Sequence, residues 1–97
     1  MSLRKEKWGT SQRRAVWLSV WQRDGGLCVG CLIEERKTPA VEIHHIVHRG
    51  QAPDGVIWRP ENMVCLCRAC HERANGRAEQ YRNYLRERYG YHYDDGE

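Results

Sequence analysis

The chain of 97 residues lacks any apolar run long enough to cross a lipid bilayer, so we expect no membrane-spanning segment. The first seven residues carry several charges, and they are not followed by the apolar segment of a secretory signal peptide. Internal repeats and low-complexity segments are also missing, apart from a repeated Cys-x-x-Cys pattern. These absences favour a soluble, cytoplasmic protein without a repeat architecture.

The length also limits the fold. A chain of this size is expected to form one domain, spanning 1–97, and is marginal for a purely hydrophobic core. A bound metal ion would supply stability that so small a core lacks.

The charge balance is mildly basic, with a formal net charge of +3. Asp94, Asp95 and Glu97 place three negative charges in a short C-terminal tail, so the rest of the chain is more positive. The excess is arginine, which makes bidentate contacts to phosphate and so favours a polyanionic partner. The simpler alternative is a basic, solvated surface without a specific partner.

Five cysteines are present, and four of them form two Cys-x-x-Cys pairs: Cys28 with Cys31, and Cys67 with Cys70. Each such turn presents two sulfurs to one ion, and Zn²⁺ binds four thiolates tetrahedrally. We therefore predict a structural zinc site. A disulfide framework is the rival interpretation, disfavoured because no signal peptide is visible, and an iron or redox site is the third. Cys65 lies in an apolar run and is predicted to be a small buried strand residue.

A first helix is predicted over 11–24. Ser11 is a suitable N-cap, and a pair of glycines follows the helix. Trp17, Val20 and Trp21 recur at helical spacing along one stripe. We therefore predict that these tryptophans pack in the core; stacking on nucleotide bases is the alternative.

The rest of the pattern alternates short strands with short helices. We predict strands over 41–47 and 62–66, a long loop over 48–61, and helices over 69–75 and 77–88. The long loop is expected to contact substrate. Ala78, Tyr81 and Leu85 are predicted to face inward from the last helix. The functional core is predicted over 27–76.

Three histidines lie close to predicted ends of these elements. A hairpin folded over one helical turn would bring His44 and His71 to the same cation, with Asn75 as a third ligand one turn beyond His71. His45 would then remain as a base, since an imidazole with a pKa of about 6.5 is mostly neutral at cytosolic pH. In the alternative without a catalytic site, His71 replaces a cysteine as a zinc ligand, and His44 and His45 only form hydrogen bonds. His48 and His92 are predicted to lie on the surface.

The two neighbouring histidines impose a geometric condition. Adjacent side chains in a regular strand point to opposite faces, which would separate His44 from His45. We therefore expect a bulge or a strand end near His45.

Three ordered segments, Glu42–Val47, Glu61–Val64 and Cys65–Asn75, resemble the motifs of the HNH endonuclease family. The resemblance is greatest to the subclass with a four-cysteine zinc site, which is common in phage-encoded nucleases. It implies an α+β chain with a ββα-metal fold, in which two antiparallel strands, a long loop and a helix surround one divalent cation. It also implies a bacterial or phage-encoded protein.

The resemblance implies roles for individual residues. His44 and His71 would bind the catalytic metal, and His45 would be the general base. Asn62 matches a central asparagine that holds the loop to the strand through backbone hydrogen bonds. Asn75 stands where many relatives have a last histidine, so it departs from the family pattern as a ligand. Cys28, Cys31, Cys67 and Cys70 would hold the structural zinc.

The implied activity is metal-dependent hydrolysis of DNA phosphodiester bonds, by nicking or by double-strand cleavage, in a monomer or a dimer. The catalytic cation would be Mg²⁺, Mn²⁺, Ni²⁺ or Zn²⁺. Phage packaging proteins are further partners that the family suggests. The candidates for DNA backbone contacts are Arg49, Arg59, Arg68, Arg73 and Arg77. Two alternatives remain: a zinc-stapled DNA-binding or interaction module with an inactive HNH site, and a redox or thiol enzyme.

Overall fold

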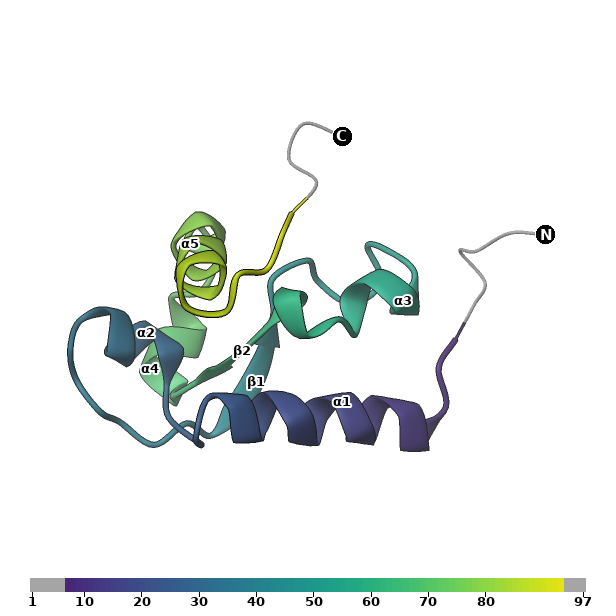
Figure 1. Ribbon diagram of the computed structural model, residues 1–97, viewed down its shortest axis with the longest axis horizontal. Coiled ribbons are helices and arrows are strands. Elements are labelled where there is room, and N and C mark those ends of the chain that lie inside the picture. Colours follow the sequence, from purple (N-terminus) through teal and green to yellow (C-terminus); the bar gives the residue numbers. More distant parts are fainter. Residues whose placement is uncertain (1–6, 94–97) are drawn as a thin grey trace.

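The computed structural model describes residues 7–93 (Figure 1). The elements, in chain order, are α1 (Thr10–Arg23), α2 (Val29–Ile33), β1 (Glu42–His45), α3 (Asp54–Ile57), the 3-10 helix η2 (Pro60–Asn62), β2 (Met63–Leu66), α4 (Arg68–Glu72) and α5 (Ala78–Tyr89). Within this range, no helix combines the length and the apolar character that crossing a bilayer requires.

The two strands form an antiparallel hairpin that separates two hydrophobic clusters. Glu42 pairs with Leu66 and His45 with Met63, so each strand contributes four residues to the ladder. Side chains alternate between the faces of β2. Val64 and Leu66 pack toward α5 and the cysteine pairs, whereas Met63 and Cys65 pack toward α1 and α3. Figure 1 shows α1 and α5 on opposite sides of the hairpin. The predicted α+β class is confirmed.

Helix α1 differs from the prediction at its start and on its exposed face. It begins at Thr10 with Gly9 as N-cap, and the Gln12 side chain accepts a hydrogen bond from the Gly9 N–H over 2.8 Å. The predicted Ser11 cap is therefore wrong. Val20 is fully buried as expected, but Trp17 is 36% exposed, so its assignment to the core is also wrong.

A buried ion pair fastens the end of α1 to the second strand. Arg23 Nε donates to Asp24 Oδ1 over 2.8 Å, and Arg23 Nη2 donates to the Met63 carbonyl over 2.7 Å. Asp24 in turn accepts from the backbone N–H of Cys65 over 3.2 Å. Cys65 is fully buried, as predicted.

The segment between the strands is more regular than the predicted loop, because it contains α3 and η2. Helix α4 is shorter than predicted, since it ends at Glu72 rather than near residue 75. Asn75 therefore does not lie one helical turn beyond His71, and that prediction is wrong. Tyr81 and Leu85 are buried on α5 as expected.

Candidate active site and metal centre

The four paired cysteines form one buried cluster. Their sulfur atoms all lie within 4.8 Å of one another, and Cys31 Sγ is 3.9 Å from the sulfurs of both Cys67 and Cys70. A tetrahedral zinc site with Zn–S bonds of about 2.3 Å has sulfurs about 3.8 Å apart. All five cysteines are free, so the disulfide alternative is wrong. The cluster assembles from cysteines alone, without His71.

The loops around this cluster fit a charged metal–thiolate group. A Cβ atom on Gly30 would lie 2.7 Å from Cys70 Sγ, so the first Cys-x-x-Cys turn needs glycine for the sulfur to approach. Arg36 Nη2 lies 3.6 Å from Cys31 Sγ. Burial raises the pKa of the Cys70 thiol to about 12, so without a cation this sulfur stays protonated at neutral pH. A metal ion bound at the cluster would stabilise the thiolate form of these sulfurs.

A second, histidine-lined pocket lies beside the hairpin. It has a volume of about 390 Å³ and is lined by Ile43, His44, His45, His48, Arg49, His71 and Asn75. The rings of His44 and His71 have centroids 5.4 Å apart, and His48 lies 5.8 Å from His44. Strand β1 and helix α4 thus bring together His44 and His71, which are 27 positions apart in the chain.

The two imidazoles at the centre of this pocket are held in different ways. His44 is buried, and its pKa is lowered to about 4, first by burial and then by the neighbouring His71 and His48. His71 is half-buried, and its Nδ1 lies 2.9 Å from Glu42 Oε2. With Nδ1 donating to the carboxylate, the lone pair of His71 is on Nε2. Glu42 has no assigned role in the sequence motif, although strand alternation places it on the same face as His44.

His45 is the last residue of β1 and contacts a different set of groups. Its Nδ1 lies 3.1 Å from the Ile57 carbonyl oxygen, and its ring lies edge-on to Trp58 with centroids 4.6 Å apart. A carbonyl only accepts, so Nδ1 carries the proton and Nε2 has the lone pair. Burial lowers the His45 pKa below 6.5, the Ile57 hydrogen bond opposes this shift, and the charge of Arg49 adds to it. The strand end expected near His45 is present.

Asn62 ties the segment after β1 to the start of β2. Its Oδ1 accepts from the Val47 N–H over 2.7 Å, and its Nδ2 donates to the carbonyls of Val47 and Ile57 over 3.1 and 3.0 Å. These are backbone hydrogen bonds of the kind that the family resemblance implies for this position. Asn62 is buried and does not line the histidine pocket.

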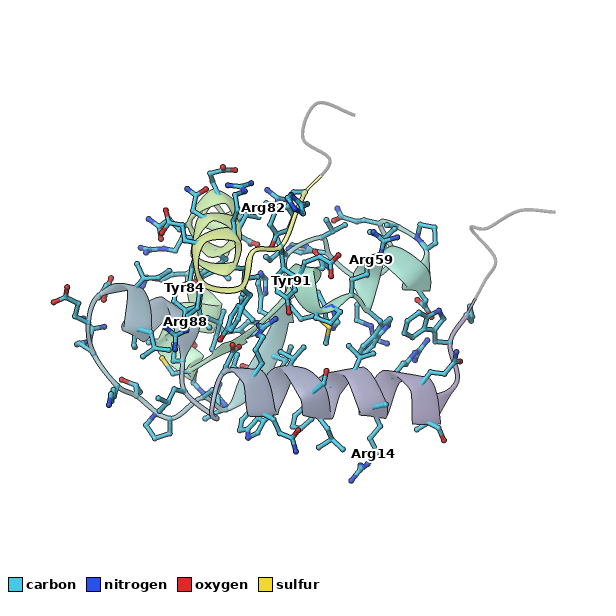
Figure 2. The ribbon with its side chains drawn as sticks, viewed as in Figure 1. Arg14, Arg59, Arg82, Tyr84, Arg88 and Tyr91 are labelled. Carbon is cyan, nitrogen blue, oxygen red and sulfur yellow. The ribbon has the colours of Figure 1, made fainter. Side chains whose placement is uncertain are left out.

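The five predicted DNA-contacting arginines lie in different places. Arg49 lines the histidine pocket. Arg59 lies beside α3 (Figure 2), and its Nε donates to the Gly55 carbonyl over 2.7 Å. Arg68 is exposed in α4, Arg73 is exposed just after it, and Arg77 precedes α5. The structure therefore places only Arg49 directly at the pocket.

Comparisons with known proteins agree with this arrangement. The family described as HNH endonuclease matches residues 28–77. A crystal structure of an HNH endonuclease from the deep-sea thermophilic bacteriophage GVE2, with a manganese ion, is similar to this chain at 36% sequence identity. The match covers 73% of this chain and 74% of that chain, with a TM-score of 0.52. No curated protein matches the chain.

A two-stranded hairpin, a helix carrying a histidine, and a four-cysteine cluster beside them define a small α+β nuclease with a metal-binding site. The chain belongs to the HNH endonuclease family, and the predicted resemblance is confirmed. It is therefore an enzyme that acts on phosphodiester bonds.

Proposed function

We propose that the protein is a metal-dependent DNA endonuclease in which His45 is the general base. The observation that carries this proposal is the hydrogen bond from His45 Nδ1 to the Ile57 carbonyl, which leaves Nε2 as a proton acceptor at the histidine pocket. Burial keeps the His45 pKa low, so the ring is neutral at cytosolic pH.

The donor set of the pocket fits one divalent cation. His44 and His71 face each other from β1 and α4, and Glu42 orients His71 with its Nε2 lone pair available. Asn75 also lines the pocket and would add an amide oxygen. Two imidazoles suit Mn²⁺, Ni²⁺ or Zn²⁺, whereas abundance favours Mg²⁺. When bound there, the cation would stabilise the negative charge that develops on the attacked phosphate and on the departing oxygen.

In the proposed reaction, His45 Nε2 accepts a proton from a water molecule as the water oxygen attacks phosphorus. The bond from phosphorus to the 3′ oxygen breaks and that oxygen takes a proton from solvent water, so the products carry a 5′-phosphate and a 3′-hydroxyl. Arg49 is placed to hold the phosphate, because it lines the same pocket as His45. Arg59, Arg68, Arg73 and Arg77 are proposed to bind neighbouring phosphates.

The four-cysteine cluster is proposed to hold a structural Zn²⁺ that takes no part in the chemistry. Its four ligands leave no open position for substrate. Because it joins α2 to α4, this ion would hold the His71 helix against the hairpin. Free thiols throughout the chain are consistent with a reducing cytoplasm, where we place the protein.

One active site cuts one strand at a time, so we propose that the monomer nicks DNA and that double-strand cleavage needs a second copy or a second encounter. A phage origin would suit a role beside packaging proteins, which are proposed as partners of the enzyme.

The competing function is DNA binding without cleavage. The observation that favours it is the position of Asn75, which is exposed and lies beyond the end of α4. A weakened third ligand would leave the catalytic cation loosely bound.

The deciding experiment follows conversion of supercoiled plasmid to nicked and linear forms, with zinc-loaded protein and each divalent metal in turn. The wild type is expected to nick DNA only with added metal. The His45→Ala variant is expected to cleave at least about 100-fold more slowly, whereas the matched control His92→Ala is expected to cleave at the wild-type rate. A folded wild-type protein that binds DNA but cuts with no metal would contradict the nuclease proposal.

A further inference from the structure

A groove between α1 and Trp58 lies next to the histidine pocket, and the chemistry proposed above does not use it. It has a volume of about 360 Å³ and is lined by Thr10, Arg13, Arg14, Trp17 and Trp58. This volume falls in the range of roughly 300–1,000 Å³ that is usual for small-ligand pockets. Two indoles and two guanidinium groups together suit a ligand that is both aromatic and negatively charged.

Trp17 has the properties of a stacking platform. It is 36% exposed, although large apolar side chains in a small protein are mostly covered. Its ring is nevertheless held in place, because it stacks on Trp21 with centroids 5.1 Å apart and planes 6° apart. Trp21 in turn packs against the hydrophobic cluster that contains Val20 and Met63. A fixed, exposed indole can stack on a nucleotide base at little entropic cost.

Trp58 connects the groove to the histidine pocket. The same indole that lines the groove lies 4.6 Å from the His45 ring. The guanidinium groups of Arg13 and Arg49 lie 5.5 and 5.3 Å from the centre of its ring. Arg49 lines the histidine pocket and Arg13 lines the groove, so positive charge is continuous from one to the other.

The charges at the groove are only partly neutralised by the protein. Asp54 forms an ion pair with Arg13 over 3.1 Å, but its carboxylate also accepts from the Trp8 N–H. Arg14 is exposed and projects outward from α1 (Figure 2). The groove therefore keeps positive charge for a ligand, carried by the exposed Arg14.

We propose that this groove binds an unpaired nucleotide of the DNA strand that is cleaved at His45, with Trp17 stacked on the base and Arg14 on a phosphate. This inference rests on the proposed nuclease function. Bases in an intact duplex are paired and stacked on each other, so Trp17 reaches a base only where the strand is single, frayed or distorted. The protein therefore prefers single-stranded or locally unpaired DNA to intact duplex.

The test measures binding of a short fluorescent DNA strand, and of the same strand in a duplex, by anisotropy. The protein carries His45→Ala so that metal can be present without cleavage. Trp17→Ala is expected to weaken single-strand binding roughly tenfold and to change duplex binding much less. Leu18→Ala is the matched control, since Leu18 is 41% exposed on the same helix but does not line the groove. Trp17→Phe should restore most of the affinity.

A second variant keeps the test decisive if Trp17→Ala does not fold. Arg14→Glu reverses an exposed charge beside the groove and should weaken single-strand binding several-fold. The proposal is overturned if Trp17→Ala and Arg14→Glu bind the single strand as tightly as Leu18→Ala does, or if single-strand and duplex binding weaken equally. Plasmid cleavage is measured in the protein with His45 intact. Cleavage by a protein whose single-strand binding does not depend on Trp17 or Arg14 overturns the groove proposal and leaves the nuclease proposal standing. Single-strand binding that depends on Trp17, without cleavage with any metal, overturns the nuclease proposal, and with it cleavage of the bound strand at His45, but not nucleotide binding in the groove.

Discussion

His45 and Asn62 donate to the same acceptor, the carbonyl oxygen of Ile57, over 3.1 and 3.0 Å. The two side chains come from the end of β1 and from the residue before β2. Asn62 also holds Val47 through both of its polar atoms. The orientation of the proposed base therefore depends on an amide that lines no part of the histidine pocket.

Asn62→Ala should lower the cleavage rate by about tenfold or more with little change in metal affinity. The substitution frees the Ile57 carbonyl and the Val47 backbone, so the His45 ring loses its fixed orientation. It should also lower the free energy of unfolding by about 1–3 kcal/mol, because buried polar groups lose their partners. Cleavage rate, metal titration and thermal unfolding measure these effects. Asn83→Ala, at an exposed asparagine of α5, is the control, and an unchanged cleavage rate in Asn62→Ala would contradict the assignment.

Glu42→Ala should weaken binding of the catalytic metal by about 10- to 100-fold, which is typical when the carboxylate behind a histidine ligand is removed. Glu42 Oε2 lies 2.9 Å from His71 Nδ1 and fixes the direction of that ring. The metal concentration that gives half-maximal cleavage is the measurement, and Glu79→Ala on α5 is the control. Equal metal requirements in both variants would show that Glu42 does not orient His71.

The rate of cleavage should fall as the pH drops below the His45 pKa, because only the neutral ring accepts a proton. Burial lowers this pKa below 6.5, and the charge of Arg49 lowers it further. The acid limb of the kcat/KM profile should therefore lie below pH 6.5. Arg49→Gln should move this limb to higher pH, besides weakening DNA binding, whereas Arg59→Gln should leave its position unchanged. An acid limb at or above pH 6.5 in the wild type would argue against His45 as the base.

Cys28→Ser should lose the structural metal and most of the folded structure. A chain of 97 residues has a small core, and the free energy of metal binding contributes directly to folding. Cys65→Ser is the matched control, because Cys65 is buried but lies outside the four-sulfur cluster. Metal content and far-ultraviolet circular dichroism separate the two. A folded Cys28→Ser protein without metal would show that the cluster is not a structural staple.

The four-cysteine cluster and the hairpin could be predicted from the sequence because their signals are local. Each Cys-x-x-Cys turn presents two sulfurs as a pair. The His44-His45 dipeptide lies on the first predicted strand, and the second predicted strand leads directly to the turn of Cys67 and Cys70. In a regular strand, His44 and His45 would point to opposite faces, and this condition predicts the strand end that the structure has at His45.

Other features depend on tertiary contacts that periodicity does not encode. Trp17 shares a helical stripe with Val20, yet Val20 is fully buried in the hydrophobic cluster whereas Trp17 is 36% exposed and stacks on Trp21. The extent of α4 was overestimated because the spacing of His71 and Asn75 suits a helix, although the chain leaves the helix at Arg73. Strand alternation places Glu42 on the face of His44, but its contact with His71 of α4 is a tertiary contact that the local pattern does not encode.

The register of β1 makes the catalytic centre intolerant of small insertions. His44 and His45 are neighbours on a strand only four residues long, and their rings contact different groups, His71 of α4 and Trp58, although both line the histidine pocket. One extra residue in the loop between the first cysteine pair and Glu42 can be accommodated without moving the strand. One extra residue inside the strand would shift the register, so the imidazoles of His44 and His45 would exchange faces. We therefore expect active variants to tolerate changes of length only in segments outside the hairpin ladder, and a functional library should leave Glu42–His45 uninterrupted.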